Sequence, residues 1–74
     1  MDIAYEKEFG KNIRKLRKRC NLTQEMLAVK FQLRGCDITR SALAKIEVGQ
    51  RHIYPDELKL FKEILNVDYE DLFI

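Results

Sequence analysis

Apolar residues recur at helical spacing along most of the chain. Phe9, Ile13 and Leu16 lie three or four residues apart, and this spacing predicts a helix from near Ala4 to Cys20. Asn21 can take the left-handed conformation that ends a helix. No segment alternates apolar with polar residues in the manner of a half-buried strand. The pattern therefore predicts an all-α fold.

A second helix is expected in the segment "TQEMLAVKF". Thr23 is a good N-cap residue, and Leu27, Ala28 and Phe31 form an apolar stripe after it. Gly35 is suited to end this helix, because glycine accepts the positive φ of a C-terminal cap.

A third helix is expected over residues 39–48. Thr39 is its N-cap, Leu43 and Ile46 face inward, and Gly49 lies just beyond its last turn. The side of this helix that faces away from its apolar residues is mostly polar. Such a face needs an explanation other than packing.

A fourth helix begins at Pro55, which fits the first helical position, and ends at Asn66. Its buried stripe consists of Leu58, Phe61 and Leu65. Asp68 caps a short fifth helix in "YEDLFI". There is no linker, repeat or low-complexity tract, so residues 1–74 are expected to form one five-helix domain around one core.

A helix that ends near a glycine turn, followed by a capped helix with an outward polar face, is typical of a helix-turn-helix. The sequence resembles the phage-repressor/Cro-like (Xre-type) family of DNA-binding regulators. The segments that carry the resemblance are "IRKLR" (13–17), "LTQEMLA" (22–28), "ITRSALAKIEVG" (38–49) and "LKLFKEILNV" (58–67). They cover nearly the whole chain, and they imply a lambda-repressor-like fold and binding to double-stranded DNA.

The resemblance places four residues of the third helix against DNA bases. Chemistry supports the assignment, because the major groove admits one helix and an arginine can fork onto the two acceptors of guanine. A serine hydroxyl can donate or accept, and a lysine further along can reach a base or a phosphate. The alternative is that these are ordinary solvated side chains. The four residues are Arg40, Ser41, Ala44 and Lys45.

Phosphates are gripped by helix N-termini and by polar loops. Thr23 and Gln24 open the second helix, and the resemblance sets Gln24 against the DNA backbone. Gln50 and Arg51 follow the third helix, where the family presents polar donors to the other flank of the groove. The alternative roles are a helix-start residue for Gln24 and a solvated loop charge for Arg51.

The resemblance also implies a structural ion pair between Arg17 and Glu47, which would fix the angle of the third helix. One departure concerns the connection before that helix. Ala28 and Glu47 are 19 positions apart, several more than the short turn of the motif implies. The excess lies in "QLRGCDI", where Arg34 is a candidate for a further backbone contact.

Charge is divided unevenly along the chain. Residues 1–54 contain twelve Lys or Arg against six Asp or Glu, a net +6, whereas residues 55–74 have a net −4. A basic end of this kind suggests a polyanionic partner. Two cysteines, Cys20 and Cys36, and the single His52 lack the paired spacing of a zinc site. No metal, no cofactor, no small-molecule effector and no catalysis are therefore expected.

No apolar run is long enough for a signal peptide or a membrane span, so a cytoplasmic location without membrane contact is expected. One short reading helix covers few base pairs, which favours a homodimer on a palindromic operator. Leu60 and Ile64, together with the apolar end at Leu72–Ile74, are candidates for its interface, notably Phe73. Alternatively, Ile3 and Tyr5 cover that surface within one chain.

The sequence thus indicates a sequence-specific transcriptional regulator, and a repressor that occupies a promoter. Two alternatives belong to other classes of protein. One is an antitoxin-like module that binds a partner protein through its acidic end and touches DNA secondarily. The other is a non-specific DNA-coating protein, which the polar set on one capped helix disfavours because coating needs only charge.

Overall fold

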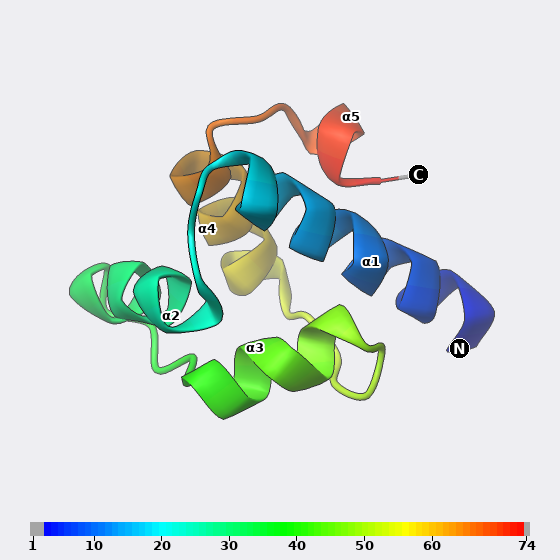
Figure 1. Ribbon diagram of the computed structural model, residues 1–74, viewed down its shortest axis with the longest axis horizontal. Coiled ribbons are helices and arrows are strands. Elements are labelled where there is room, and N and C mark those ends of the chain that lie inside the picture. Colours follow the sequence, from blue (N-terminus) through cyan, green and yellow to red (C-terminus); the bar gives the residue numbers. More distant parts are fainter. Residues whose placement is uncertain (1–2, 74) are drawn as a thin grey trace.

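The computed structural model describes residues 3–73, and within that part it contains helices and no strand (Figure 1). The predicted all-α fold with five helices is confirmed. Figure 1 shows α3 along one face of the molecule and α5 on the opposite face, with α1 between them. The helices are α1 (Ile3–Arg19), α2 (Gln24–Leu33), α3 (Arg40–Glu47), α4 (Pro55–Leu65) and α5 (Tyr69–Leu72).

The helix ends follow the chemistry of single residues. Asn21 after α1 and Asn66 after α4 both adopt the left-handed conformation, with φ of 57° and 55°. The Oγ1 of Thr23 accepts a hydrogen bond from the backbone N–H of Met26 at 3.0 Å, and the hydroxyl of Thr39 caps α3 in the same manner. The predicted starts of α2 and α3 are confirmed.

The starts of α4 and α5 are also as predicted, although the capping differs. Pro55 occupies the first turn of α4, and Glu57 Oε1 accepts from the backbone N–H of Tyr54 at 3.1 Å. Asp68 is the N-cap residue of α5, where Asp71 Oδ2 accepts from the Asp68 N–H at 3.0 Å. In both helices a carboxylate in the first turn satisfies a backbone donor.

The core lies where all five helices meet. The rings of Phe31 and Phe61 cross edge to face with centroids 4.7 Å apart. Leu58, predicted to be buried in α4, is only partly covered and packs against the rim of this cluster. The buried apolar residues are Phe9, Ile13, Leu16, Leu27, Ala28, Phe31, Ile38, Leu43, Ile46, Phe61, Leu65 and Leu72.

The crossing of α1 and α3 depends on Gly10, a residue that the hydrophobic pattern did not single out. A Cβ at this position would lie 2.4 Å from the carbonyl oxygen of Ile46 and 2.7 Å from that of Glu47. The end of α3 therefore approaches the α1 backbone more closely than any side chain allows. Gly49 has a φ of 78°, and a Cβ there would lie 2.9 Å from Lys7 Cγ and 3.0 Å from the Lys7 backbone.

The long connection between α2 and α3 is divided between helix and loop. The second helix extends to Leu33, Gly35 follows with φ of 80°, and residues 34–39 complete the connection. Arg34, a candidate for a DNA contact, forms an ion pair with Glu63 of α4. The extra residues are thus held against the body of the domain.

The prediction of an exposed apolar C-terminal end is wrong for Leu72, which is fully buried in the core. Phe73 is 45% exposed, and its ring lies 5.2 Å from that of Phe9. Leu60 and Ile64 are half-buried against the core. Ile74 and the side chain of Ile3 lie outside the described residues. Among the helices of residues 3–73, none combines the length and the apolar character needed to cross a bilayer.

Candidate nucleic-acid interface

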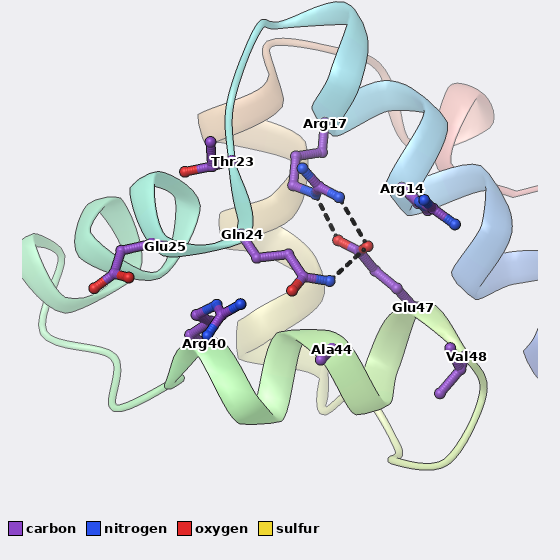
Figure 2. A pocket seen from close by; sticks show the side chains of 9 residues that line it. All are labelled: Arg14, Arg17, Thr23, Gln24, Glu25, Arg40, Ala44, Glu47 and Val48. Carbon is purple, nitrogen blue, oxygen red and sulfur yellow. Dashed lines mark hydrogen bonds and ion pairs between the residues drawn. The ribbon is translucent and has the colours of Figure 1, made fainter.

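A concave surface of about 810 Å³ opens between α1, the start of α2 and the outer side of α3. Figure 2 shows the lining side chains on α1, around the start of α2 and along α3. We call this surface the reading groove. It is lined by Arg14, Arg17, Thr23, Gln24, Glu25, Arg40, Ala44, Glu47 and Val48.

The floor of the reading groove is a hydrogen-bonded junction centred on Glu47. Arg17 Nε donates to Glu47 Oε2 at 2.7 Å, and Arg17 Nη2 donates to Oε1 at 3.1 Å (Figure 2). Gln24 Nε2 donates to the same Oε1 at 3.1 Å, and Arg17 Nη1 donates to the carbonyl of Leu22 at 2.7 Å. The pair implied by the resemblance is present, and Gln24 joins it.

The ion pair at the centre of this junction is buried. The side chains of Arg17 and Glu47 are only 8% and 2% exposed, so the two charges depend on each other and on their hydrogen bonds. The pair ties the end of α3 to α1, and Gln24 ties it to the start of α2. Together these contacts fix the direction of α3 relative to the rest of the domain.

The four predicted base-contacting residues lie on α3. Arg40 and Ala44 line the reading groove, whereas Ser41 and Lys45 are exposed on the adjoining side of the helix. The Arg40 side chain forms no ion pair or hydrogen bond with any residue in the range 3–73. Its guanidinium is a free cation at the N-terminal end of α3, close to the start of α2 (Figure 2).

The four predicted phosphate-contacting residues flank α3 on two sides. Thr23 and Gln24 line the reading groove at the start of α2 and are already engaged in the helix cap and the Glu47 junction. Gln50 is exposed in the connection after α3, where its N–H donates to the Lys45 carbonyl at 2.8 Å.

Arg51 is held within the protein by a two-pronged ion pair. Its Nη1 and Nη2 donate to the two carboxylate oxygens of Glu57 at 2.9 Å and 3.0 Å, and Nη1 also donates to the carbonyl of His52. The guanidinium lies 5.8 Å from the ring centroid of Tyr54. Arg51 therefore shapes the connection between α3 and α4.

Electrostatics of the Arg51–Glu57 pair agree with its geometry. Burial raises the pKa of Glu57, but the hydrogen bonds from Arg51 and from the Tyr54 N–H outweigh it, so the pKa lies below its ordinary value. The hydrogen bond to Glu57 raises the pKa of Arg51. Both groups are charged at neutral pH.

Arg14 is a groove residue that the sequence analysis did not assign. It precedes Arg17 by three residues, and Figure 2 shows it on α1 facing the same groove. The helical spacing of the two arginines was the available signal. Cys20 and Cys36 are both free thiols, and within residues 3–73 no three potential metal-ligating side chains come together.

Comparisons with known proteins agree with this geometry. The sequence model of the helix-turn-helix family matches residues 13–72. The restriction-modification controller protein C.AhdI from Aeromonas hydrophila has a TM-score of 0.84 at 28% identity, over 96% of each chain. The DNA-binding domain of BldD has a TM-score of 0.85 at 22% identity over the whole of both chains, and this likeness concerns the fold alone. No curated protein sequence matches the chain.

Proposed function

This chain belongs to the phage-repressor/Cro-like (Xre-type) helix-turn-helix family of DNA-binding regulators, and from that premise we propose that it is a sequence-specific repressor of transcription. Members of this family regulate by binding DNA and are not enzymes. The observation that carries the finer proposal is the free guanidinium of Arg40 on a helix whose direction the Glu47 junction fixes. A charge without a protein partner is available to a ligand.

In the proposed complex, α3 enters the major groove with its N-terminal half foremost. Arg40 donates to the two acceptors of a guanine, and Ser41 donates to or accepts from a neighbouring base edge. Ala44 is small enough to contact a thymine methyl group, and Lys45 reaches a base acceptor or a phosphate. These four contacts determine sequence preference.

The start of α2 and the connection after α3 grip the backbone on either side. Thr23 and Gln24 contact one phosphate strand, and Gln50 and Arg51 contact the other. Two copies related by a two-fold axis bind a palindromic operator, with the dimer formed through the surface of Leu60, Ile64 and Phe73. Repression follows because a protein bound over a promoter blocks its use.

The test is to select bound duplexes from a random DNA pool at physiological salt and to sequence them. An enriched palindrome is expected, and the spacing of its half-sites measures the separation of the two α3 helices. A pool without enrichment contradicts sequence-specific reading.

The antitoxin-like alternative predicts a different response to substitution. In that case Leu60→Ala or Phe73→Ala abolishes function in the cell, whereas Arg40→Ala leaves it intact. The repressor proposal predicts that Arg40→Ala weakens operator binding and so reduces promoter occupancy.

A further inference from the structure

The outer side of α1 carries a row of basic side chains, of which only Arg14 also lines the reading groove. Five of them line a second, shallow surface with no other residue type in it. The set recurs at helical spacing, on the side of α1 opposite the buried Ile13 and Leu16. We call it the basic strip, and it consists of Lys11, Arg14, Lys15, Lys18 and Arg19.

The charges of the basic strip are almost unneutralised. Lys11 forms an exposed pair with Glu8 at 3.3 Å, an arrangement worth little in water. The other four members form no ion pair with any residue in the range 3–73. By contrast, Arg17, Arg34 and Arg51 each face a carboxylate elsewhere in the fold. Four basic side chains without an ion pair therefore lie together on the outer side of α1.

The basic strip is continuous with the reading groove. Arg14 lines both surfaces, so the strip adjoins the groove at this residue, and it extends along α1 from Lys11 to Arg19. From Lys11 to Arg19 the helix rises about 12 Å, at about 1.5 Å per residue. A DNA duplex presents about one negative charge per 1.7 Å of its axis, so several phosphates lie within this length.

We propose that the basic strip binds the phosphate backbone of the duplex beyond the base pairs that α3 reads. The proposal rests on the proposed function only in that α3 orients the duplex. The strip contains lysines and arginines and no apolar side chain to enter a lipid surface. Its row of like charges suits the closely spaced negative charges along a duplex.

Binding of the strip to phosphates would release counterions from the DNA, so the affinity would depend on salt concentration. Each phosphate contact contributes about 0.9 to the slope of log K against log salt. Between 50 and 200 mM salt, each contact thus costs about a 3–4-fold loss of affinity. Because phosphates carry no sequence information, the strip raises affinity for all duplexes alike.

The experiment compares two double variants with the same change in net charge. Lys15→Gln/Lys18→Gln removes two members of the strip, and Lys30→Gln/Lys59→Gln removes two exposed lysines of α2 and α4. Glutamine keeps a high helix propensity at all four exposed positions. Affinity for a mixed-sequence duplex of about 30 base pairs is measured over a salt series.

For the strip variant, the slope is expected to be about 1.8 units shallower than for the original protein, and the control variant should keep most of the original slope. Equal slopes for the two variants would overturn the proposal, because net charge alone would then explain the effect. The proposal would also be overturned if the two variants differed in slope only in complexes of one protein with two duplexes.

Failure of the proposed function remains distinguishable. The base preference selected from a random pool depends on α3 and is expected to be the same with and without the strip substitutions. If the original protein shows no preference, sequence-specific reading fails, while the salt slopes on mixed-sequence DNA still decide whether the strip binds phosphates.

Discussion

Two arginines line the same groove, but one is buried in an ion pair and the other is exposed without one. Arg17 is buried, and its guanidinium is satisfied by Glu47 and the Leu22 carbonyl. Arg40 is exposed and has no partner within the described residues. Loss of the first should therefore affect folding, and loss of the second should affect binding.

Arg40→Ala is expected to weaken binding to the selected operator by about 1–3 kcal/mol and to relax preference at one base pair. Thermal unfolding should not change, because the side chain supports nothing in the fold. Competition binding with operators altered one base pair at a time measures the effect. A uniform loss of affinity for all sequences would instead make Arg40 a phosphate contact.

Arg17→Met leaves the Glu47 carboxylate buried without its cation and is expected to cost about 3–5 kcal/mol of unfolding free energy. The double variant Arg17→Met/Glu47→Leu should recover much of that loss, because it removes both charges together. Urea unfolding of the two proteins provides the measurement. If the double variant were as unstable as the single, the pair itself would be the source of stability.

Glu57 is expected to make the free energy of unfolding fall at acid pH. The pKa of Glu57 is lower in the folded protein than its ordinary value of 4.5. As pH falls, its carboxylate is therefore protonated in the unfolded chain before it is protonated in the folded protein. The contribution is therefore fully present above about pH 4.5 and is lost as pH falls through the lower folded pKa. Urea unfolding between neutral and acid pH should show this loss, and Glu57→Gln should reduce it.

The position of α3 is set by a glycine in another helix. Gly10→Ala would ordinarily stabilise a helix by about 0.5–1 kcal/mol. Here the added Cβ meets the carbonyl oxygens at the end of α3, so a net loss of stability is expected. Val29→Ala, at an exposed position of α2, is a control in which helix propensity rises without a clash. A stabilised Gly10→Ala protein would show that α3 can move aside.

Helix ends were predictable because they depend on single residues. Thr23, Thr39 and Pro55 start helices, and Asn21 and Asn66 end them, through interactions within a few positions of the chain. The family resemblance added the pair between Arg17 and Glu47, which are thirty positions apart.

Contacts between distant segments were not predictable from local pattern. The role of Gly10 depends on which residues of α3 cross it, and the partner of Arg34 depends on how the long connection packs against α4. Leu72 was placed in a candidate apolar patch because it lies in an apolar run with Phe73, whereas its side chain is buried in the core.

The uneven charge of the sequence is also uneven in space. The α3 face and the α5 face are opposite sides of the domain (Figure 1), and the segment that contains α4 and α5 has the acidic excess. Residues 1–54, with their net +6, contain α1, the reading groove and the basic strip. A domain with such a charge separation turns its basic side toward DNA before contact.

The proposed dimer can be tested with two exposed residues on different faces. Phe73→Glu is expected to shift the protein toward a monomer in sedimentation experiments, because Phe73 is a 45% exposed apolar residue of the proposed interface. Leu33→Glu, on an 81% exposed residue of α2, should leave the dimer unchanged. If Leu33→Glu gave a monomer and Phe73→Glu did not, the interface would lie on α2. If the unsubstituted protein were itself a monomer, the proposed dimer would be contradicted.

The junction at Glu47 also has a consequence for the kinetics of recognition. Because α1 and α2 both hold the end of α3, the helix arrives at DNA already ordered and loses little conformational entropy there. Correct and incorrect sequences should then be encountered at similar rates. Discrimination between them should be expressed almost wholly in how long each complex survives before it dissociates.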